Sequence, residues 1–383
     1  TVLEQGDARG ERGVGLNLLP HAVRMLADLD LLDAITGIGV RTATLTYAHR
    51  LGMPIVRRPC GLAAGFDLPQ VSCHRGRFHR LLLDTVRDRL GSDAVRTGAR
   101  VTGVDTAGAV TLSHRETVHA DVVIGADGIH SAVRAALVPG EGPPRWNGVS
   151  MWRGAVDWPA FDGGAAMIVA GGTAAKLVVY PIGPGARPGT VLTNWAICIL
   201  TGRGGDPPPH QQDWSRPGDP AVVAAHARRF RLADVDHHAL VAATPVAYEF
   251  PMCDRDPMRR WTHGRVSLLG DAAHPMYPMG SNGAGQAILD AESLARHLAA
   301  ASASGADPGA ALTAYEAERL PVTADVVRRN RAGGPEGVID EVERRAPDGF
   351  DRLADVMPDA ERDAILSSYA AATGATPEQV RRV

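Results

Sequence analysis

Lysine is nearly absent from this chain of 383 residues, since Lys176 is the only one and arginine supplies the other basic side chains. No dense run of Lys and Arg occurs, so we expect no nucleic acid or other polyanion as a partner. The 40 basic and 43 acidic residues leave a formal net charge of −3. With 45% hydrophobic and 22% charged residues, the composition is typical of a soluble globular enzyme.

Cysteine and long apolar runs are scarce as well. The four cysteines are scattered and form neither a CxxC pair nor a Cys/His ligand spacing, which argues against a disulfide framework and a zinc site. The adjacent His237 and His238 cannot share one face of a helix, so they predict no metal site either. No stretch of 18 apolar residues and no signal peptide is visible, and we expect a cytoplasmic protein without a membrane span.

The chain also lacks an initiator methionine. Its first five residues have the pattern of the end of a β-strand. A strand that begins at residue 1 leads us to expect that sequence before it is missing.

The pattern of strands and helices indicates two joined domains. Strands and helices alternate towards both ends, whereas residues 149–200 are rich in strands separated by Gly and Pro. We therefore expect an α/β fold: a Rossmann-like domain with an inserted antiparallel sheet, followed by a helical C-terminal segment. The expected strands cover 43–47, 101–112 (a hairpin), 121–126, 149–156, 166–169, 177–181, 191–199, 246–250 and 265–271, and the expected helices cover 18–35, 75–90, 129–137, 222–232, 281–300 and 310–331.

The strongest local signal is the run from Leu268 to Gly285. A buried strand ends in Gly270-Asp271, which places a carboxylate at the carboxyl edge of the sheet, where open α/β sheets bind their ligands. A loop rich in Pro and Gly then leads into the N-terminus of a helix, where free amides and the helix dipole stabilise negative charge. The alternative is a loop that binds no ligand.

Other residues give weaker signals. Asp127 follows a second buried strand at a tight turn, although Asp127 and Ser131 could equally serve as caps of the next helix. Glu4 stands at the end of a strand, where an acid can bind a ribose diol or simply face solvent. His274 does not indicate a Ser/His/Asp triad, because no G-x-S-x-G nucleophile elbow accompanies it.

Taken in order, these residues resemble the flavin monooxygenase family of the para-hydroxybenzoate hydroxylase fold, over roughly residues 1 to 330. The resemblance rests on Gly13-Val14-Gly15-Leu16-Asn17-Leu18 with Pro20, on His74-Arg75-Gly76, on Asp127-Gly128 with Ser131 and Arg134, and on Gly270-Asp271 with its loop. It implies that Arg75 contacts the flavin and that Asp271 binds the ribityl chain. The amides of Gly283 to Gly285 would face the N1/O2 edge of the flavin. The residues that the resemblance assigns to FAD are Glu4, Gly15, Arg75, Val101, Asp127, Asp271, Pro278, Gly283, Ala284 and Gly285, and those linked to NAD(P)H are Asp127 and Arg134.

Three further segments resemble the phenazine-modifying monooxygenases of pyocyanin biosynthesis within this family. They are Val149 to Gly154, Pro251 to Pro257 and Met276 to Gly280. They imply an aromatic, phenazine-like carboxylate as substrate. The candidate substrate contacts, each of which is also typical of a core or a sheet face, are Trp152, Arg153, Tyr180, Tyr248 and Met252.

One departure from the family lies at the start. The family opens with a strand and a Gly-x-Gly-x-x-Gly turn that cradles the FAD pyrophosphate, and no such motif precedes Glu4. We expect that the first ~30 residues of the usual βαβ unit are missing from the sequence. The other interpretation is that the protein lacks this half of the site and binds FAD weakly.

The resemblance implies a monooxygenase that depends on FAD and on NADH or NADPH. The nicotinamide would reduce the flavin, O2 would form a C4a-hydroperoxyflavin, and its distal oxygen would pass to the aromatic ring. No catalytic side chain is expected, because the flavin carries the chemistry. Two alternatives are a flavin-dependent reductase or dehydrogenase on the same fold, and a truncated remnant that cannot hold FAD.

The same resemblance suggests a division into domains. Residues 1–148 and 251–332 are expected to form the FAD-binding domain, with strands near 43–73 that join the substrate sheet. Residues 149–250 would form the substrate-binding sheet domain, and residues 333–383 a helical segment. We expect a monomer or a homodimer.

Overall fold

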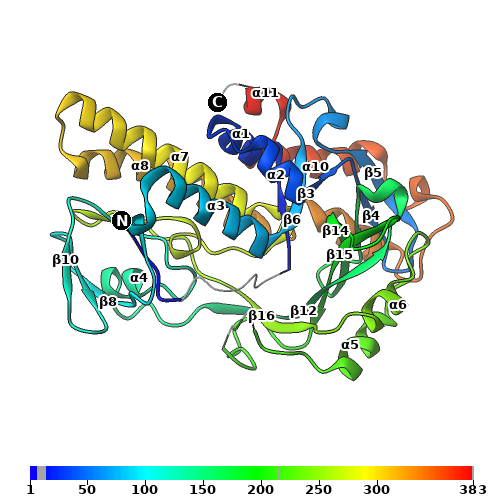
Figure 1. The fold of residues 1–383 in the computed structure, drawn as a ribbon. Coiled ribbons are helices and arrows are strands. Elements are labelled where there is room, and N and C mark those ends of the chain that lie inside the picture. Colours follow the sequence, from blue (N-terminus) through cyan, green and yellow to red (C-terminus); the bar gives the residue numbers. More distant parts are fainter. Residues whose placement is uncertain (7–13, 212, 214, 382–383) are drawn as a thin grey trace.

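A computed structural model describes residues 1–6, 14–211, 213 and 215–381 of the chain. Figure 1 shows an α/β part, with the long helices α7 (Gly283–Ser304) and α8 (Pro308–Arg331), beside a large sheet. C-terminal helices pack on the far side of this sheet from the short helices α5 (Pro220–Ala227) and α6 (His237–Ala242) (Figure 1). The predicted fold class, an α/β domain with an inserted sheet and a helical C-terminal segment, is confirmed.

Seven strands form the large sheet, in the order β16, β12, β15, β14, β13, β4, β5. Neighbours pair antiparallel except β13 and β4, which are parallel. Each strand predicted in this region is present, and several extend further because their alternating side chains are buried on both faces. Their bounds are β4 (Thr44–Ala48), β5 (Pro54–Pro59), β12 (Arg145–Pro159), β13 (Ala166–Ala170), β14 (Ala175–Pro184), β15 (Thr190–Leu200) and β16 (Tyr248–Asp254).

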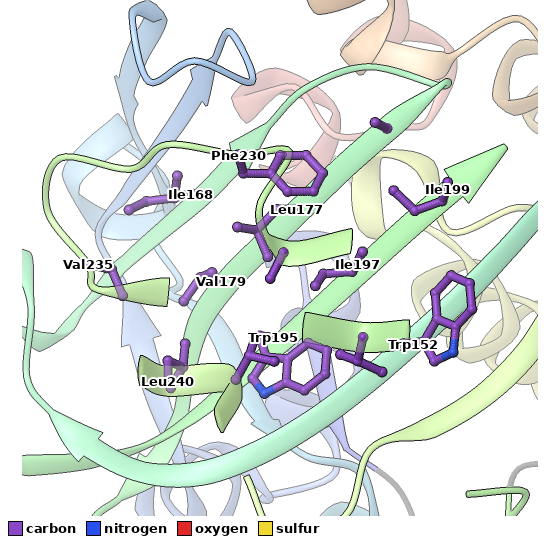
Figure 2. Packing of buried hydrophobic residues seen from close by; sticks show 14 of the residues in the cluster. Trp152, Ile168, Leu177, Val179, Trp195, Ile197, Ile199, Phe230, Val235 and Leu240 are labelled. Atoms are coloured by element: carbon purple, nitrogen blue, oxygen red, sulfur yellow. The ribbon is translucent and has the colours of Figure 1, made fainter. Parts of the chain in front are cut away.

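One face of the large sheet is covered by the short helices α5 (Pro220–Ala227) and α6 (His237–Ala242). Because side chains alternate along a strand, every second residue of β12, β14 and β15 points to these helices. Figure 2 shows Trp152 and Trp195 in this apolar layer. Trp195 is fully buried, and its indole N–H donates to Thr244 Oγ1 over 2.8 Å, so its one polar atom is satisfied.

The opposite face of the sheet turns towards the α/β part. Met151, Cys198 and Phe250 lie on it and pack against Tyr277 and Met279, which belong to the loop before α7. Apolar side chains therefore line this part of the junction between the sheet and the α/β part.

The α/β part contains two parallel strands, β11 (Val123–Gly125) and β17 (Val266–Leu268). Helices α7 and α8 pack beside them around the fully buried Tyr315, whose hydroxyl donates to Leu268 O over 3.0 Å. Parallel strands buried on both faces need such helical cover. The remaining elements of this part are α4 (Ala132–Leu137), β1 (Val2–Leu3), β7 (Val95–Arg96), β8 (Val101–Val104), β9 (Ala109–Leu112) and β10 (Thr117–His119).

A three-stranded sheet of β2 (Gly15–Leu18), β6 (Gln70–His74) and β3 (Gly39–Thr42) connects the two parts. Helix α3 (Arg75–Leu90) follows β6 and ends at a glycine C-cap, as the sequence predicted. The single helix predicted at 18–35 is wrong. Asp30 has a φ of 58°, which a right-handed helix cannot continue through, and it separates α1 (Pro20–Asp28) from α2 (Leu32–Ile38).

The helices predicted at 129–137, 222–232, 281–300 and 310–331 are present, with bounds that differ by two to five residues. Two of these differences have a clear physical cause. The helix predicted at 222–232 ends five residues early, at Ala227, because the chain turns there to bury Phe230 under the sheet. The helix predicted from 281 begins at Gly283, because Ser281 has a φ of 58°.

The C-terminal segment forms the short helices that the sequence predicted. They are η6 (Gly334–Glu336), α9 (Gly337–Arg345), η7 (Leu353–Asp355), α10 (Asp359–Ala372) and α11 (Pro377–Arg381). Val338, Ile339 and Val342 of α9 are fully buried against the face of the sheet that carries Tyr47 and Met167. This segment is therefore part of the core.

Candidate functional site

Two carboxylates follow the ends of adjacent parallel strands. Gly125 of β11 pairs with Leu268 of β17, so Asp127 and Asp271 stand at the same edge of the α/β part, where the sequence predicted Asp271. A φ of 60° at Gly270 turns the chain into the short helix η4 (Gly270–Ala272). Glycine adopts this backbone conformation without a clash of Cβ.

Arg134 joins the two strand ends. Its guanidinium is buried and donates to Ala272 O over 3.0 Å and to Ala273 O over 2.8 Å. It also forms an ion pair with Glu141. Asp127 and Ser131 cap α4, which is one of the two roles expected for them. Asp127 accepts a hydrogen bond from the amide of Ala132 over 2.7 Å, and Ser131 Oγ accepts one from the amide of Arg134 over 2.8 Å. These contacts fix the Asp127 turn against the Asp271 loop.

Below the Asp271 loop, Asp290 of α7 accepts three hydrogen bonds. They come from Gly270 N over 3.2 Å, from Arg319 Nε over 2.8 Å and from His274 Nε2 over 2.5 Å. Burial raises the pKa of Asp290, but His274 and Arg319 outweigh it and hold the pKa below its usual value. Asp290 therefore remains ionised and fixes the loop from the inside.

Asp271 itself faces outward. Its side chain reaches solvent and accepts no hydrogen bond within the part of the chain that the structure describes. The protein packed around it raises the pKa of the carboxyl, while His274 and Arg75 act in the opposite direction. Arg75 opens α3, and burial lowers the pKa of its guanidinium while Asp271 acts to raise it. Two predicted flavin contacts, Arg75 and Asp271, therefore lie within electrostatic reach of each other.

The first turn of α7 offers unused amides. Asn282 is its N-cap residue, yet its side chain accepts no capping hydrogen bond. The amides of Gly283, Ala284 and Gly285 have no acceptor within an α-helix, so this helix end attracts negative charge. Gly283 has open space where a side chain would start, since only Met276 Cγ lies within 4 Å, at 3.8 Å. Pro278 is exposed just before this turn.

The β2 strand brings Gly15 to the same junction. Asn194 Oδ1 accepts from Gly15 N over 2.8 Å, and Arg153 Nη2 donates to Gly15 O over 2.6 Å. A Cβ at Gly15 would lie 2.5 Å from the hydroxyl of Tyr180, so only glycine fits here. Burial raises the pKa of Tyr180, and the positive charge of the nearby Arg153 acts against this rise. Gly13, at the start of the predicted motif, lies outside the described residues.

The predicted substrate contacts divide between the two faces of the sheet. Arg153 and Tyr180 lie on the junction face, and the pairing of Tyr248 with Arg153 and the packing of Met252 place these two on it as well. Trp152 points to the other face, against His226 of α5, at a ring distance of 4.7 Å. We therefore leave Trp152 out of the substrate site proposed below.

Glu4 and Val101 belong to the same small region of the α/β part. Ala99 N donates to Glu4 O over 2.9 Å, and Val101 packs in a small cluster with Leu3. Glu4 Oε1 accepts from the amide of Gly6 over 2.6 Å. Their assignment to FAD stays a prediction.

Sequence reasoning missed His21, which lies directly behind the first turn of α7. The ring is buried, and neither of its nitrogens has a hydrogen-bond partner within the described structure. A Cβ at Gly285 would lie 2.8 Å from His21 Nε2, so the two helices touch here. Burial lowers the pKa of His21 to about 4, and Arg319 adds to the effect. The imidazole is thus neutral at pH 7.

His21 should make the fold sensitive to acid. Its pKa falls from 6.5 in the unfolded chain to about 4 in the fold, so the unfolded state binds the proton first and stability decreases as the pH falls through this window. The loss from this one group should reach about 3 kcal/mol at pH 4. Urea unfolding at pH 7 and pH 4.5 measures it. His21→Leu should show a smaller difference between the two pH values, and an unchanged difference would contradict this account.

Two kinds of site were not found in the described parts of the chain. No group of three or more His, Cys, Asp or Glu side chains is placed to hold a metal ion. No described helix has the length and apolar character to cross a membrane.

Comparison with known proteins identifies the family. The FAD binding domain family matches residues 5–330. A phenazine 1,6-dicarboxylic acid hydroxylase from Lysobacter antibioticus is 39% identical over 341 residues, which are 86% of this chain and 82% of that protein. A 3-amino-4-hydroxybenzoate 2-monooxygenase from Streptomyces platensis is 35% identical, over 97% of this chain and 88% of its own. The structure of Klebsiella pneumoniae HpxO with FAD and uric acid shares the fold, with a TM-score of 0.71 at 23% identity over 99% of this chain and 90% of that one. The chain therefore belongs to the FAD-binding family of flavin-dependent monooxygenases that hydroxylate aromatic compounds.

Proposed function

We propose that this protein takes electrons from NADH or NADPH and uses O2 to hydroxylate an aromatic carboxylate at the junction between the α/β part and the large sheet. The observation that carries the proposal is the convergence of Arg75, Asp271 and the uncapped first turn of α7 with Arg153 of the sheet. The proposed flavin contacts and the proposed substrate-binding cation thus lie near one another.

The residues at this junction fit FAD. Asp271 has an accessible carboxylate that accepts no hydrogen bond from the described residues, which suits the hydroxyls of the ribityl chain. The free amides of Gly283 to Gly285 suit the negative charge that develops on a reduced flavin. We keep the predicted roles of Gly15, Arg75 and Pro278 as flavin contacts within this proposal.

Bound FAD would carry electrons from the nicotinamide to O2 and oxygen to the ring. The chain's own groups hold and orient the reactants. Asp290 and Arg134 fix the two strand-end loops, and the apolar residues Met151, Phe250 and Met252 exclude water from the ring. We keep within this proposal the predicted link of Asp127 and Arg134 to the use of NAD(P)H.

Arg153 is the residue that we assign to the carboxylate of the substrate. Its Nε is buried and has no hydrogen-bond partner within the described residues, and the same holds for Asn194 Nδ2. Both are donors, and a buried donor without an acceptor costs free energy until a ligand supplies one. Several relatives are named for aromatic acids, among them phenazine 1,6-dicarboxylic acid and 3-amino-4-hydroxybenzoate.

Replacing Arg153 by methionine should raise the KM for an aromatic acid by about 10- to 100-fold, because a hydrogen bond to a charged group contributes about 1.5–3 kcal/mol. For the methyl ester of the same acid, the substitution should raise the KM much less, because the ester carries no negative charge. Steady-state kinetics at saturating FAD measure both values. Arg187→Met, on an exposed turn of the same sheet, serves as the control. Equal losses for acid and ester would contradict the role of Arg153.

The test of the function as a whole is oxidation of NADH or NADPH by the FAD-loaded protein across a panel of aromatic acids, phenazine carboxylates included. We expect at least one acid to accelerate it and to be hydroxylated. A panel in which no acid changes the rate would contradict the proposed substrate class.

We also propose the division predicted from the sequence, with residues 1–148 and 251–332 as the FAD-binding domain, 149–250 as the substrate sheet and 333–383 as the C-terminal segment. A cytoplasmic location agrees with four free cysteines, all of them buried. A monomer or a homodimer stays a prediction.

A further inference from the structure

The loop from Tyr277 to Asn282 has little structure of its own. It contains one short helix, η5 (Met279–Ser281), and two successive residues with positive φ, Gly280 at 61° and Ser281 at 58°. A left-handed conformation at a serine costs about 1 kcal/mol or more and persists only where the surroundings enforce it. The loop leads directly into α7, so its shape decides where the uncapped amides of α7 stand.

Tyr369 of α10 contacts this loop with its hydroxyl. The oxygen lies 2.7 Å from Asn330 Oδ1 and 3.1 Å from Met279 O, and it accepts from Asn282 Nδ2 over 3.1 Å. One hydroxyl hydrogen serves one acceptor at a time, and the nearer acceptor is Asn330. The ring of Tyr369 packs directly against Gly280. A Cβ at Gly280 would lie only 2.7 Å from Tyr369 Cε1, so a larger residue would not fit there.

Two neighbours of Tyr369 bind further backbone groups of the same loop. Asn330, at the end of α8, donates from Nδ2 to Tyr277 O over 2.8 Å. Glu336 of η6 accepts from Gly280 N over 3.2 Å. Side chains from α8, η6 and α10 therefore supply the backbone partners that this irregular loop cannot supply itself.

We propose that Tyr369 is a positioning residue for the flavin. Through its contacts with Met279, Asn282 and Asn330 it holds the loop in the shape that sets Pro278 and the first turn of α7 against the cofactor. This proposal rests on the flavin contacts proposed above for Pro278 and for Gly283 to Gly285.

The experiment compares Tyr369→Phe with the wild-type protein. Phenylalanine keeps the ring and its packing and removes only the hydroxyl, so the fold should persist. Hydrogen exchange of peptides that cover residues 277–285, measured without FAD, should become faster by about fivefold or more, since a buried hydrogen bond contributes about 1 kcal/mol. With FAD, the dissociation constant should rise by a similar factor, and the midpoint potential of the flavin should fall, because less ordered amides stabilise the reduced flavin less.

Glu343→Gln is the matched control. Glu343 lies on α9 in the same C-terminal segment, accepts from Arg50 N over 2.8 Å and pairs with the Arg50 guanidinium at 3.2 Å, away from the loop. The Glu343→Gln variant should leave the hydrogen exchange of residues 277–285 and the midpoint potential of the flavin unchanged.

The outcomes separate this proposal from the proposed function. Unchanged exchange of residues 277–285 in Tyr369→Phe would overturn the positioning role, whatever the enzyme hydroxylates. Faster exchange with unchanged FAD affinity and potential would also overturn it, because the loop would then not face the flavin. Faster exchange together with weaker FAD binding supports it even if no substrate is hydroxylated.

Discussion

Replacing Asp271 by alanine should weaken FAD binding by about 100-fold, and Asp271→Asn by about tenfold. In the proposed site the carboxylate accepts a hydrogen bond from the ribityl chain, and a hydrogen bond to a charged acceptor contributes about 1.5–3 kcal/mol. Asparagine keeps one acceptor oxygen and loses the charge, which explains the smaller loss. Fluorescence titration of the protein with FAD measures both values.

Neither variant should destabilise the protein without FAD. The pKa of Asp271 is raised by the surrounding protein, which means that the ionised carboxyl is less favourable in the fold than in water. The fold therefore retains a carboxylate that it does not need for its own stability. Asp121→Asn is the control, because that side chain is 96% exposed and lies outside the site. FAD affinity that is equal in wild type and Asp271→Ala would remove Asp271 from the cofactor site.

Lys176→Met should lower the free energy of unfolding by about 3–5 kcal/mol, because it leaves Glu336 as an unpaired buried charge. The only lysine of the chain is 3% exposed, and its Nζ lies 2.5 Å from Glu336 Oε2. Burial lowers the pKa of Lys176, but Glu336 outweighs it and the pKa is raised, so the lysine stays protonated. The pair joins β14 to the C-terminal segment in the core.

A second substitution tests whether the unpaired charge is the cause. The variant Lys176→Met/Glu336→Gln should regain most of the lost stability, because glutamine carries no charge and still offers an acceptor to Gly280 N. Urea unfolding of the wild type, the two single variants and the double variant gives the coupling free energy. If the double variant is as unstable as Lys176→Met, the loss comes from packing and not from the charge.

The strands and the Gly-Asp motif could be predicted from the sequence because their signals are local. Apolar patterns identified six strands of the large sheet but not the edge strand β5, and Gly270-Asp271 after a buried strand located the sheet edge at which the site is proposed. The helix break at Asp30 carried no such signal, because aspartate seldom adopts a positive φ.

The contacts that shape the site could not be predicted, because they join residues far apart in the chain. Asn194 binds Gly15 across 179 positions, and Tyr369 binds Asn282 across 87. Nothing in the residues near Tyr369 distinguishes it from an ordinary core tyrosine. The sequence also did not show which face of the sheet Trp152 points to, because a shift of one residue along a strand moves a side chain to the other face.

The most direct test of the central claim uses isotopically labelled O2. The FAD-loaded protein is incubated with NADH or NADPH and an aromatic acid that accelerates the oxidation of the nicotinamide, and the product is analysed by mass spectrometry. We predict a hydroxylated product that carries one labelled oxygen atom for each turnover. Oxidation of the nicotinamide with O2 consumed, but without label in any aromatic product, would contradict a monooxygenase and favour a flavin-dependent reductase on the same fold.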